Sequence, residues 1–442
     1  MTKIASIRLV CTLAAILDLD LEQLNIKTAY LNGHLEKEIY MKPPEGVTSE
    51  TDDVWLLLCT IYSLKQSGKV WNDLIHSVLI ELGFIACTGD KCLYIYQHEG
   101  ILIIIALYVD DLLAANNSRA VWIHIKQKLK DRFNITELGE AHLLLGMEII
   151  HDRPNWTIAL SQRCYIQDIC EKYGMADANT VQTPLDPNTP LSSAQSPQTD
   201  AEIAEMKSIP YQNVTGSLLY AAMATRPDIA FTTGSLCRFN SNYGNEHWMA
   251  AKQVMWYLKG TQDLSLVYDG KLDNNLSAIA HGFSDADWAG DVDSRKSTSG
   301  YVFMMAGATI TWSSKAQVTP ALSSTEAEYI SSTRAAQEAI WLRTILTDLG
   351  SKPTLPTTIW CDNQSAIALA TNTTDANSRM KHIDVRHHFI RDIITSKQIT
   401  IQWCPTEDQA ADILTKALPR GKHEHFVHLL GMVPRLRGGV ET

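Results

Sequence analysis

Several features that would place this 442-residue sequence in other protein classes are missing from it. No stretch contains 18 uninterrupted apolar residues, so neither a transmembrane helix nor a membrane partner is expected. The N-terminal apolar run lacks a small-residue cleavage site before acidic residues arrive, which predicts an amphipathic helix rather than a signal peptide. The nine cysteines include no C-x-x-C pair. This argues against a zinc cluster or a disulfide framework and favours a reducing, intracellular compartment, cytoplasmic or nuclear.

Positive charge is scarce as well, because 38 Lys and Arg residues face 49 Asp and Glu residues, a formal net charge of −11 at pH 7. Proteins that bind nucleic acid usually present a basic face. An acidic total does not exclude such a face, since clustered active-site carboxylates add to the negative count, but composition alone does not indicate nucleic acid. Composition does indicate a globular protein, because 45% of the residues are hydrophobic, and the length suits two or three domains.

The most informative stretch is ILIIIALYVDDLL, residues 101–113. A β-branched apolar run of this length predicts a fully buried strand, and it ends in two adjacent carboxylates, Asp110 and Asp111. Alternation along a strand points these side chains to opposite faces, so at least one must face a cleft, solvent or a cation. Taken alone, the pair is compatible with an ordinary hairpin turn. A hairpin that presents metal-binding carboxylates needs the same arrangement, and the rest of the chain has to decide between the two.

The chain is predicted to be an α/β protein in several parts. Residues 1–175 form a first mixed domain in this prediction, and 211–275 carry helical patterns. Between them, 176–210 are rich in Pro, Ser, Thr and Gln and are predicted to be a linker or a long surface excursion. The elements expected in these parts are helices at 4–17, 63–82, 122–133, 211–223, 228–238 and 245–259 and strands at 21–26, 54–58 and 143–150.

A second α/β domain is predicted over 276–420, followed by a tail over 421–442. Its order is three strands, a helix, a strand, helices, a strand and a last helix, which describes one sheet with helices on its faces. In the tail, His423, His425 and His428 are expected on a frayed helix rather than at a metal. The expected elements are strands at 279–285, 300–305, 309–312, 357–361 and 399–404 and helices at 324–349, 365–371, 387–395 and 406–417.

Carboxylates recur where these elements end. Asp285 and Asp362 follow strands, Glu326 and Glu328 lie in the long helix, and Asp412 lies in the last helix. Each aspartate alone is ordinary turn or N-cap chemistry. If the groups converge on one cleft, they cannot all stay ionised unless cations bind there. Two Mg²⁺ ions bridged by such carboxylates stabilise the attacking and leaving oxygens of a phosphodiester displacement.

Longer motifs carry a resemblance to a known family. The downstream motifs resemble the ribonuclease H domain of copia-type long-terminal-repeat retrotransposon polyproteins, and the upstream motifs resemble the reverse transcriptase and connection of the same family. The resemblance covers essentially the whole chain. The downstream motifs are SDADWAGD (284–291), SSTEAEY (323–329), CDNQSAI (361–367) and PTEDQAADILTKAL (405–418), and the upstream motifs are IKTAYLNGHLEKEIYMKPPEG (26–46), LYVDDLL (107–113) and HWMAAKQVMWYLKGT (247–261).

In the ribonuclease H part, the resemblance implies that Asp285, Asp362 and Asp412 are catalytic metal ligands. It implies the same role for Glu328, with Glu326 as the alternative. His382 and His387 fall in another family motif and receive no role beyond packing or substrate contact.

In the polymerase part, the resemblance implies that Asp110 and Asp111 are catalytic metal ligands and that Tyr30 and Gln66 line the nucleotide site. Each of the two active sites is expected to take two Mg²⁺ ions, with Mn²⁺ as an alternative. The expected partners are RNA/DNA hybrids, template-primers and dNTPs, and a homo- or hetero-oligomer is left open.

The polymerase part also departs from the family. The first palm strand of the family reads like QxDVKTAF, and this sequence has Asn25 in place of the aspartate. An amide oxygen brings no negative charge to Mg²⁺, so we expect polymerase activity to be lower by orders of magnitude. Ser63 stands where the family usually has Gly. The family's fingers segment, expected ahead of Met1, and its protease and integrase motifs are not found in the sequence.

These observations predict a reverse transcriptase palm with truncated fingers over 1–175, a linker over 176–210, a helical thumb or connection over 211–275 and a ribonuclease H-like domain over 276–420. Cleavage of hybrids is the activity expected to survive. The alternatives are a catalytically silent remnant that binds nucleic acid and a decayed transposon product that does not fold stably.

Overall fold

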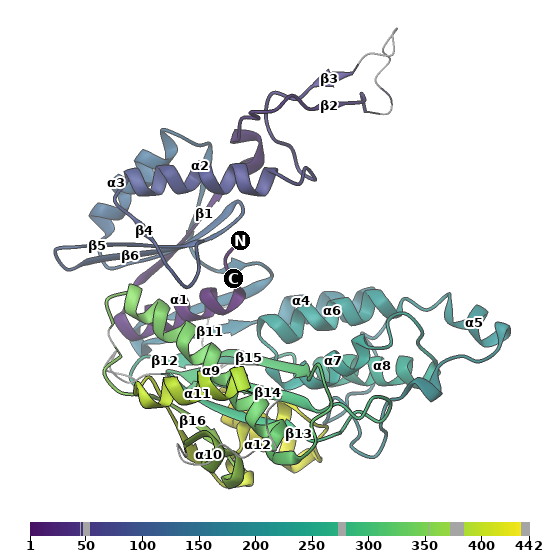
Figure 1. Cartoon of the computed structure of the whole chain (residues 1–442). Helices are drawn as coiled ribbons and strands as arrows, with labels where there is room; N and C mark the ends of the chain where they lie inside the picture. Colours follow the sequence, from purple (N-terminus) through teal and green to yellow (C-terminus); the bar gives the residue numbers. More distant parts are fainter. Residues whose placement is uncertain (45, 47–53, 273–279, 352, 372–383, 435–442) are drawn as a thin grey trace. The chain divides into compact units, whose positions relative to one another are not determined.

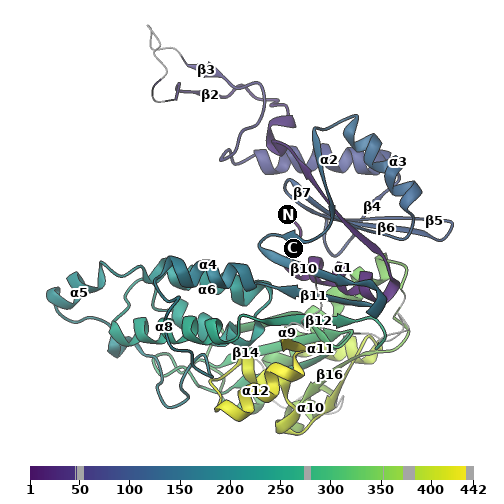
Figure 2. The ribbon, with the colours of Figure 1, turned by 180° about the vertical axis from the view of Figure 1, so that it is seen from behind.

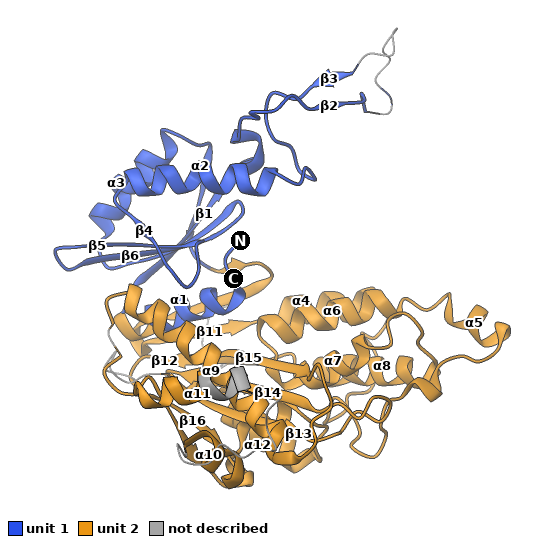
Figure 3. Ribbon diagram, in the orientation of Figure 1, with its two compact units in different colours: residues 1–14, 18–141 blue, residues 15–17, 142–442 orange. Residues whose placement is uncertain are grey.

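The computed structural model describes residues 1–44, 46, 54–272, 280–351, 353–371 and 384–434, with only the backbone described for 384–388. The chain divides into two compact units (Figure 3). Unit 1 holds Met1–Ala14 and Asp18–Ala141, and unit 2 holds Ala15–Leu17 and His142–Thr442. Each unit combines sheets with helices, which confirms the predicted α/β class. The assignment of domain names to parts of the chain stays a prediction.

Unit 1 is built on a sheet with the strand order β4-β5-β6-β7-β1-β8 (Figure 1). The predicted buried strand is β6 (Ile101–Tyr108), which pairs antiparallel with β7 (Asp111–Asn116), and β7 pairs with β1 (Asp20–Ile26). Helices α2 (Ser67–Glu81) and α3 (Arg119–Lys130) bury Trp71 and Trp122 in the core formed with these strands. The other elements are α1 (Ile4–Leu17), η1 (Ala29–Asn32), β2 (Tyr40–Met41), β3 (Trp55–Leu56), β4 (Ile85–Ala86), β5 (Leu93–His98) and β8 (Ile135–Glu140).

Unit 2 contains a second sheet, in the order β18-β12-β11-β10-β9, beside a group of helices. Strands β10 (Met147–Asp152), β11 (Thr157–Ser161) and β12 (Leu264–Asp269) pair antiparallel and lie side by side (Figure 2). The predicted linker contributes Leu185 and Leu191 to the helical core, because single leucines in a proline-rich segment can still be buried against helices. The helices are α4 (Arg163–Lys172), α5 (Asp200–Met206), α6 (Tyr211–Ala224), α7 (Ala230–Cys237) and α8 (Asn245–Gly260), with short turns η2 (Arg153–Asn155), η3 (Ser193–Gln195) and η4 (Pro227–Ile229).

The third sheet, also in unit 2, has the order β15-β14-β13-β16-β17. Its first three strands are antiparallel, whereas β13, β16 and β17 are parallel neighbours. The long helix α9 (Ser324–Asp348) packs on β13 and β14, and its small Ala, Ser and Thr residues let its first half be buried on nearly all sides. The bounds are β13 (His281–Asp287), β14 (Thr298–Met305), β15 (Ala308–Ala316), β16 (Thr357–Cys361), α10 (Gln364–Thr371), α11 (Asp384–Thr395) and β17 (Ile399–Trp403).

Three local predictions are corrected by the structure. The strand predicted over 143–150 is divided into β9 (Leu143–Leu144) and β10, because Leu145 and Gly146 form a turn with φ angles of 51° and 69°. The helix predicted over 406–417 is replaced by two 3₁₀ turns, η6 (Thr406–Asp408) and η7 (Ala410–Leu414). Between them, the buried side-chain amide of Gln409 donates to the Ser284 carbonyl, which fixes the backbone in a non-helical path.

The third correction concerns the predicted tail, because residues 420–434 form a helix and a strand that belong to the fold. Helix α12 (Arg420–Leu429) buries His423 and Phe426, and β18 (Met432–Pro434) then pairs antiparallel with β12. His425 and His428 are exposed while His423 is buried, so the three histidines do not share one environment. None of the helices in the described ranges has the length and apolar character needed to cross a membrane.

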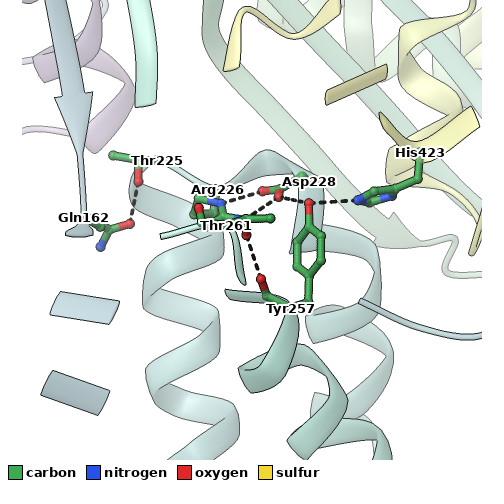
Figure 4. Close-up of polar contacts among 7 residues, drawn as sticks. All are labelled: Gln162, Thr225, Arg226, Asp228, Tyr257, Thr261 and His423. Atoms are coloured by element: carbon green, nitrogen blue, oxygen red, sulfur yellow. Dashed lines mark hydrogen bonds and ion pairs between the residues drawn. The ribbon is translucent and has the colours of Figure 1, made fainter. Parts of the chain in front are cut away.

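A buried network holds α12 against the helices of unit 2 (Figure 4). Arg226 donates to both carboxylate oxygens of Asp228, at 3.0 and 2.7 Å, and both side chains are 0% exposed. The Tyr257 hydroxyl donates to Asp228 at 2.7 Å and lies 3.0 Å from His423 Nε2. Burial opposes the charge on Asp228, but Arg226 keeps the pKa of its carboxyl below the ordinary value. The network thereby fixes the position of α12 relative to α8.

Candidate active sites

Carboxylates singled out in the sequence meet at one end of the third sheet. Asp285 lies on β13, Glu328 lies near the start of α9, Asp362 directly follows β16, and Asp412 lies in η7. Parallel neighbours β13 and β16 end at the same edge of the sheet, so Asp285 near the end of β13 and Asp362 just after β16 lie at that edge. Oxygens of Glu328 and Asp362 lie within 4.8 Å of each other.

Burial and mutual repulsion perturb these groups strongly. Burial, together with the Asp412 carboxylate, raises the pKa of Asp285 to about 7. Burial, together with the carboxylates of Asp285 and Asp362, raises the pKa of Glu328 to about 10. Glu328 is only 5% exposed, and its Oε2 has no hydrogen-bond partner among the described residues. A buried oxygen without a partner beside several carboxylates fits a divalent cation, which prefers oxygen ligands and relieves their repulsion.

The two glutamates at the start of α9 have different surroundings. Ser323 caps the helix by accepting from the Glu326 backbone N–H at 3.1 Å, and Glu326 Oε2 in turn accepts from the Leu322 backbone N–H at 2.8 Å. Glu328 is instead buried near Asp285. The structure therefore brings Glu328 to the other carboxylates and leaves Glu326 at the helix terminus.

Two lysines that the sequence analysis did not single out hold Asp412. Lys416 Nζ lies 2.9 Å from Asp412 Oδ1, and Lys422 Nζ lies 2.5 Å from Oδ2. The spacing of Asp412 and Lys416, four residues apart, was a readable signal. Lys422 comes from α12, which was predicted to be a tail, so the sequence carried no signal for it.

Hydroxyl groups orient two further carboxylates. Thr415 Oγ1 donates to Asp285 Oδ2, and Thr406 Oγ1 donates to Asp362 Oδ2 at 2.8 Å. His382 lies outside the described residues, and only the backbone of His387 is described.

The second candidate site is the hairpin of unit 1. Asp110 lies in the turn between β6 and β7, and Asp111 is the first residue of β7. The preceding Val109 has a φ angle of 57°, and its carbonyl accepts a hydrogen bond from Trp71 Nε1 at 2.7 Å. Burial, with a contribution from the adjacent Asp111, raises the pKa of Asp110. The turn is thus fixed by a tryptophan from α2.

Asn25 lies directly opposite Asp111 in the register of β1 and β7. Its Nδ2 donates to Asp111 Oδ1 at 3.1 Å. The family pattern has a third carboxylate at this position. In this chain the neutral side-chain amide of Asn25 takes its place and donates a hydrogen bond to Asp111 Oδ1.

Of the two residues predicted to line the nucleotide site, Tyr30 lines a cavity and Gln66 does not line that cavity. Tyr30, in η1, packs edge-on against Tyr62 with ring centroids 4.8 Å apart. It lines a cavity of about 170 Å³ together with Trp71, Leu107 and Val109. Gln66 directly precedes α2 and is not among the residues that line this cavity.

Comparisons with known proteins agree with the motifs. A family profile described as reverse transcriptase (RNA-dependent DNA polymerase) matches residues 1–187. The Pol polyprotein of transposon TNT 1-94 from Nicotiana tabacum is 40% identical over 97% of this chain and 32% of its own length. The transposon Ty5-1 protein of Saccharomyces cerevisiae is 35% identical over 71% of this chain and its entire length. A solved foamy viral protease–reverse transcriptase in complex with double-stranded DNA aligns with 88% of this chain and 57% of its own, at 11% identity and a TM-score of 0.47.

The profile and the relatives place the chain among reverse-transcriptase-related proteins. It belongs to the family of copia-type retrotransposon Pol polyproteins. The chain spans about a third of the length of the plant polyproteins that it matches, 32%, 29% and 28% for three of them.

Proposed function

We propose that this chain cleaves the RNA strand of RNA/DNA hybrids, with Asp285, Glu328, Asp362 and Asp412 as its metal ligands. The observation that carries the proposal is the convergence of these carboxylates at one end of the third sheet, where oxygens of Glu328 and Asp362 lie within 4.8 Å of each other and burial beside other carboxylates raises the pKa values of Asp285 and Glu328. Clusters of carboxylates that perturb one another in this way are typical of functional sites.

In this proposal some residues bind the metal ions and others orient the metal ligands. The carboxylates would hold the ions, Thr415 and Thr406 orient Asp285 and Asp362 through hydrogen bonds, and Lys416 keeps Asp412 in place. Two bound divalent ions, Mg²⁺ or Mn²⁺, would supply the stabilisation of the attacking and leaving oxygens. Burial of Asp285 and Glu328 keeps bulk water away from the ligand oxygens, which strengthens their interaction with a cation.

The test is cleavage of a labelled RNA/DNA hybrid by the purified chain with Mg²⁺. Asp362→Asn should lower the cleavage rate by at least about 100-fold, the order lost when one group of an electrostatic centre is removed. Asp408→Asn is the control and should leave the cleavage rate unchanged. Asp408 is an exposed aspartate at the end of η6, four residues before Asp412, and it is not one of the proposed metal ligands. No cleavage by a cooperatively folding sample would favour the alternative, a remnant that binds nucleic acid without cleaving it.

We further propose that the hairpin of unit 1 binds template-primer and dNTP with Mg²⁺ at Asp110 and Asp111, but extends primers poorly. The neutral Asn25 opposite Asp111 supports this second proposal. Tyr30 would line the nucleotide site from its cavity beside Val109, and Gln66 would reach it from the start of α2. Substitution of Asn25, described below, tests the proposal.

A further inference from the structure

One buried side chain beside the carboxylates of the third sheet has no part in the function proposed above. Cys361 is the last residue of β16, directly before Asp362, and it is 0% exposed. One ligand atom from each of Glu328, Cys361 and Asp362 lies within 4.8 Å of the other two. The Cys361 sulfur thus lies beside the carboxyl groups of Glu328 and Asp362, and it also donates to the Asn363 carbonyl at 4.0 Å.

A second observation points to a ligand at this position. Oε2 of Glu328 is buried and has no hydrogen-bond partner in the described part of the chain, and Glu328 is 5% exposed. An oxygen of this kind is unfavourable unless a donor or a cation satisfies it. Glu328 belongs to the same group of ligand atoms as Cys361 and Asp362, so this unpartnered oxygen is part of a residue of the candidate site.

The two carboxyl groups and the thiol of this cluster favour different metal ions. Mg²⁺ is a hard ion that takes oxygen ligands, so it would use the carboxylates and ignore the sulfur. Zn²⁺ and Cd²⁺ accept thiolate, and three protein ligands with one open position form a known zinc geometry. At bond lengths of about 2.0–2.3 Å, tetrahedral ligand atoms lie about 3.5 Å apart, so a contraction of about 1 Å from the present spacing would complete the site.

We propose that Glu328, Cys361 and Asp362 form a site for one thiophilic divalent ion, of the Zn²⁺ or Cd²⁺ type, which competes with Mg²⁺ at the ribonuclease H-like centre. The inference rests on the proposed metal-binding function of this cluster. The Cys361 thiol releases its proton to solvent as the metal–sulfur bond forms. The ion would occupy two of the proposed catalytic ligands, so its binding would inhibit the Mg²⁺ enzyme.

The chain offers a matched control for Cys361. Cys404 directly follows the neighbouring strand β17, is buried, and donates its backbone N–H to the Cys361 carbonyl at 3.1 Å. It is not part of the group whose ligand atoms converge. Both cysteines are therefore buried at the ends of neighbouring strands, but only Cys361 has its sulfur close to the carboxyl groups of Glu328 and Asp362.

The experiment is a Cd²⁺ titration of the full chain, followed by the thiolate-to-cadmium charge-transfer absorption. Cys59, Cys164 and Cys237, the free cysteines that are not buried, are first replaced by Ser to remove competing thiols. We expect one equivalent of tightly bound Cd²⁺, displaced by Zn²⁺ and weakened by excess Mg²⁺. Cys361→Ser should abolish the absorption band, Cys404→Ser should retain it, and Glu328→Gln should keep the band but weaken binding at least about 10-fold.

An absorption band of equal strength in Cys361→Ser would overturn the inference, as would equal loss in Cys361→Ser and Cys404→Ser. If Cys361→Ser does not fold, Glu328→Gln decides, because unchanged Cd²⁺ affinity in that variant excludes the site. Hybrid cleavage with Mg²⁺ is measured separately. A chain that binds Cd²⁺ through Cys361 but does not cleave would refute the proposed function and leave the metal site standing.

Discussion

The side-chain amide of Asn25 donates a hydrogen bond to the carboxylate of Asp111 across the pairing of β1 and β7, at 3.1 Å. The family pattern has an aspartate at this position, and two carboxylates facing each other there would repel unless a cation lay between them. Asparagine removes this repulsion. The hairpin of this chain is therefore compatible with a metal-free state in which Asp111 is already satisfied.

Asn25→Asp should raise the rate of primer extension by at least about 100-fold, the order that one electrostatic group contributes to such a centre. The same substitution should lower the melting temperature of the metal-free chain and make it rise more with Mg²⁺ than that of the unmodified chain, because the ion would separate two facing carboxylates. Extension on a primed template and thermal melting with and without Mg²⁺ measure the two effects.

Asn25→Ala serves as the control, since it removes the hydrogen bond without adding charge. It should leave extension low, and Mg²⁺ should raise its melting temperature no more than that of the unmodified chain. An extension rate that is already normal in the unmodified chain, and unchanged by Asn25→Asp, would refute the idea that this position limits polymerisation.

Asp228→Asn should lower the free energy of unfolding by about 3–5 kcal/mol, because it leaves the fully buried Arg226 guanidinium without its counter-charge. Urea unfolding measures the effect. Asp263→Asn is the matched control, since the pair of Asp263 with Arg163 is longer, 3.4 Å, and exposed. The control should change stability by less than about 1 kcal/mol. Similar values for both variants would show that the network does not depend on charge.

The metal-free chain should lose stability as the pH rises from about 5 to about 9. The ordinary pKa values of Asp285 and Glu328 are 3.8 and 4.5, and folding raises them to about 7 and about 10. Between these values the folded state binds more protons than the unfolded state, so the free energy of unfolding decreases with pH. Urea unfolding at a series of pH values, in the presence of a metal chelator, measures how steeply the free energy of unfolding falls with pH. Glu328→Gln should flatten it, and an equally steep decline in that variant would contradict the assignment.

Lys422→Met should lower the stability of the metal-free chain by roughly 1–2 kcal/mol, because Asp412 is 0% exposed and loses one of its two lysine partners. Mg²⁺ should restore part of the loss if it binds Asp412. Arg420→Met is the control on the same helix, since its pair with Glu424 is exposed and should matter little. Thermal melting of both variants with and without Mg²⁺ measures the effects. A loss of stability as large in Arg420→Met as in Lys422→Met would contradict a specific role of the Lys422–Asp412 pair.

Much of this architecture was predictable because local patterns and tertiary packing agree. The helix over 4–17 and the strand over 357–361 have the predicted bounds, since their apolar spacing also matches the face that they bury. The hairpin at Asp110 and Asp111 was predictable because a β-branched apolar run favours a buried strand and two adjacent aspartates favour a turn after it, and β6 and β7 pair in this way.

The parts that were missed depend on contacts between distant residues. The region 406–417 has a helical pattern, but the buried Gln409 amide bonds to Ser284 on β13 and prevents a helix. Lys422 and His423 looked like parts of a tail, and only the fold brings them to Asp412 and Tyr257. Cys361 was read as one of several scattered cysteines, because its distance from Glu328 depends on how α9 packs on the sheet.

The pairing of β12 with β18 determines where the part of the chain that holds the third sheet can be cut out as a separate piece. β12 ends at Asp269 and β18 begins at Met432, and the two strands are hydrogen-bonded neighbours. The polypeptide between these two strands therefore starts and ends at neighbouring positions in the second sheet. A recombinant piece cut at 276 and 420 would forfeit both strands and α12 with its lysine, whereas one spanning 264–434 would keep them. The adjacency of its two ends would also suit circular permutation through a short joining peptide.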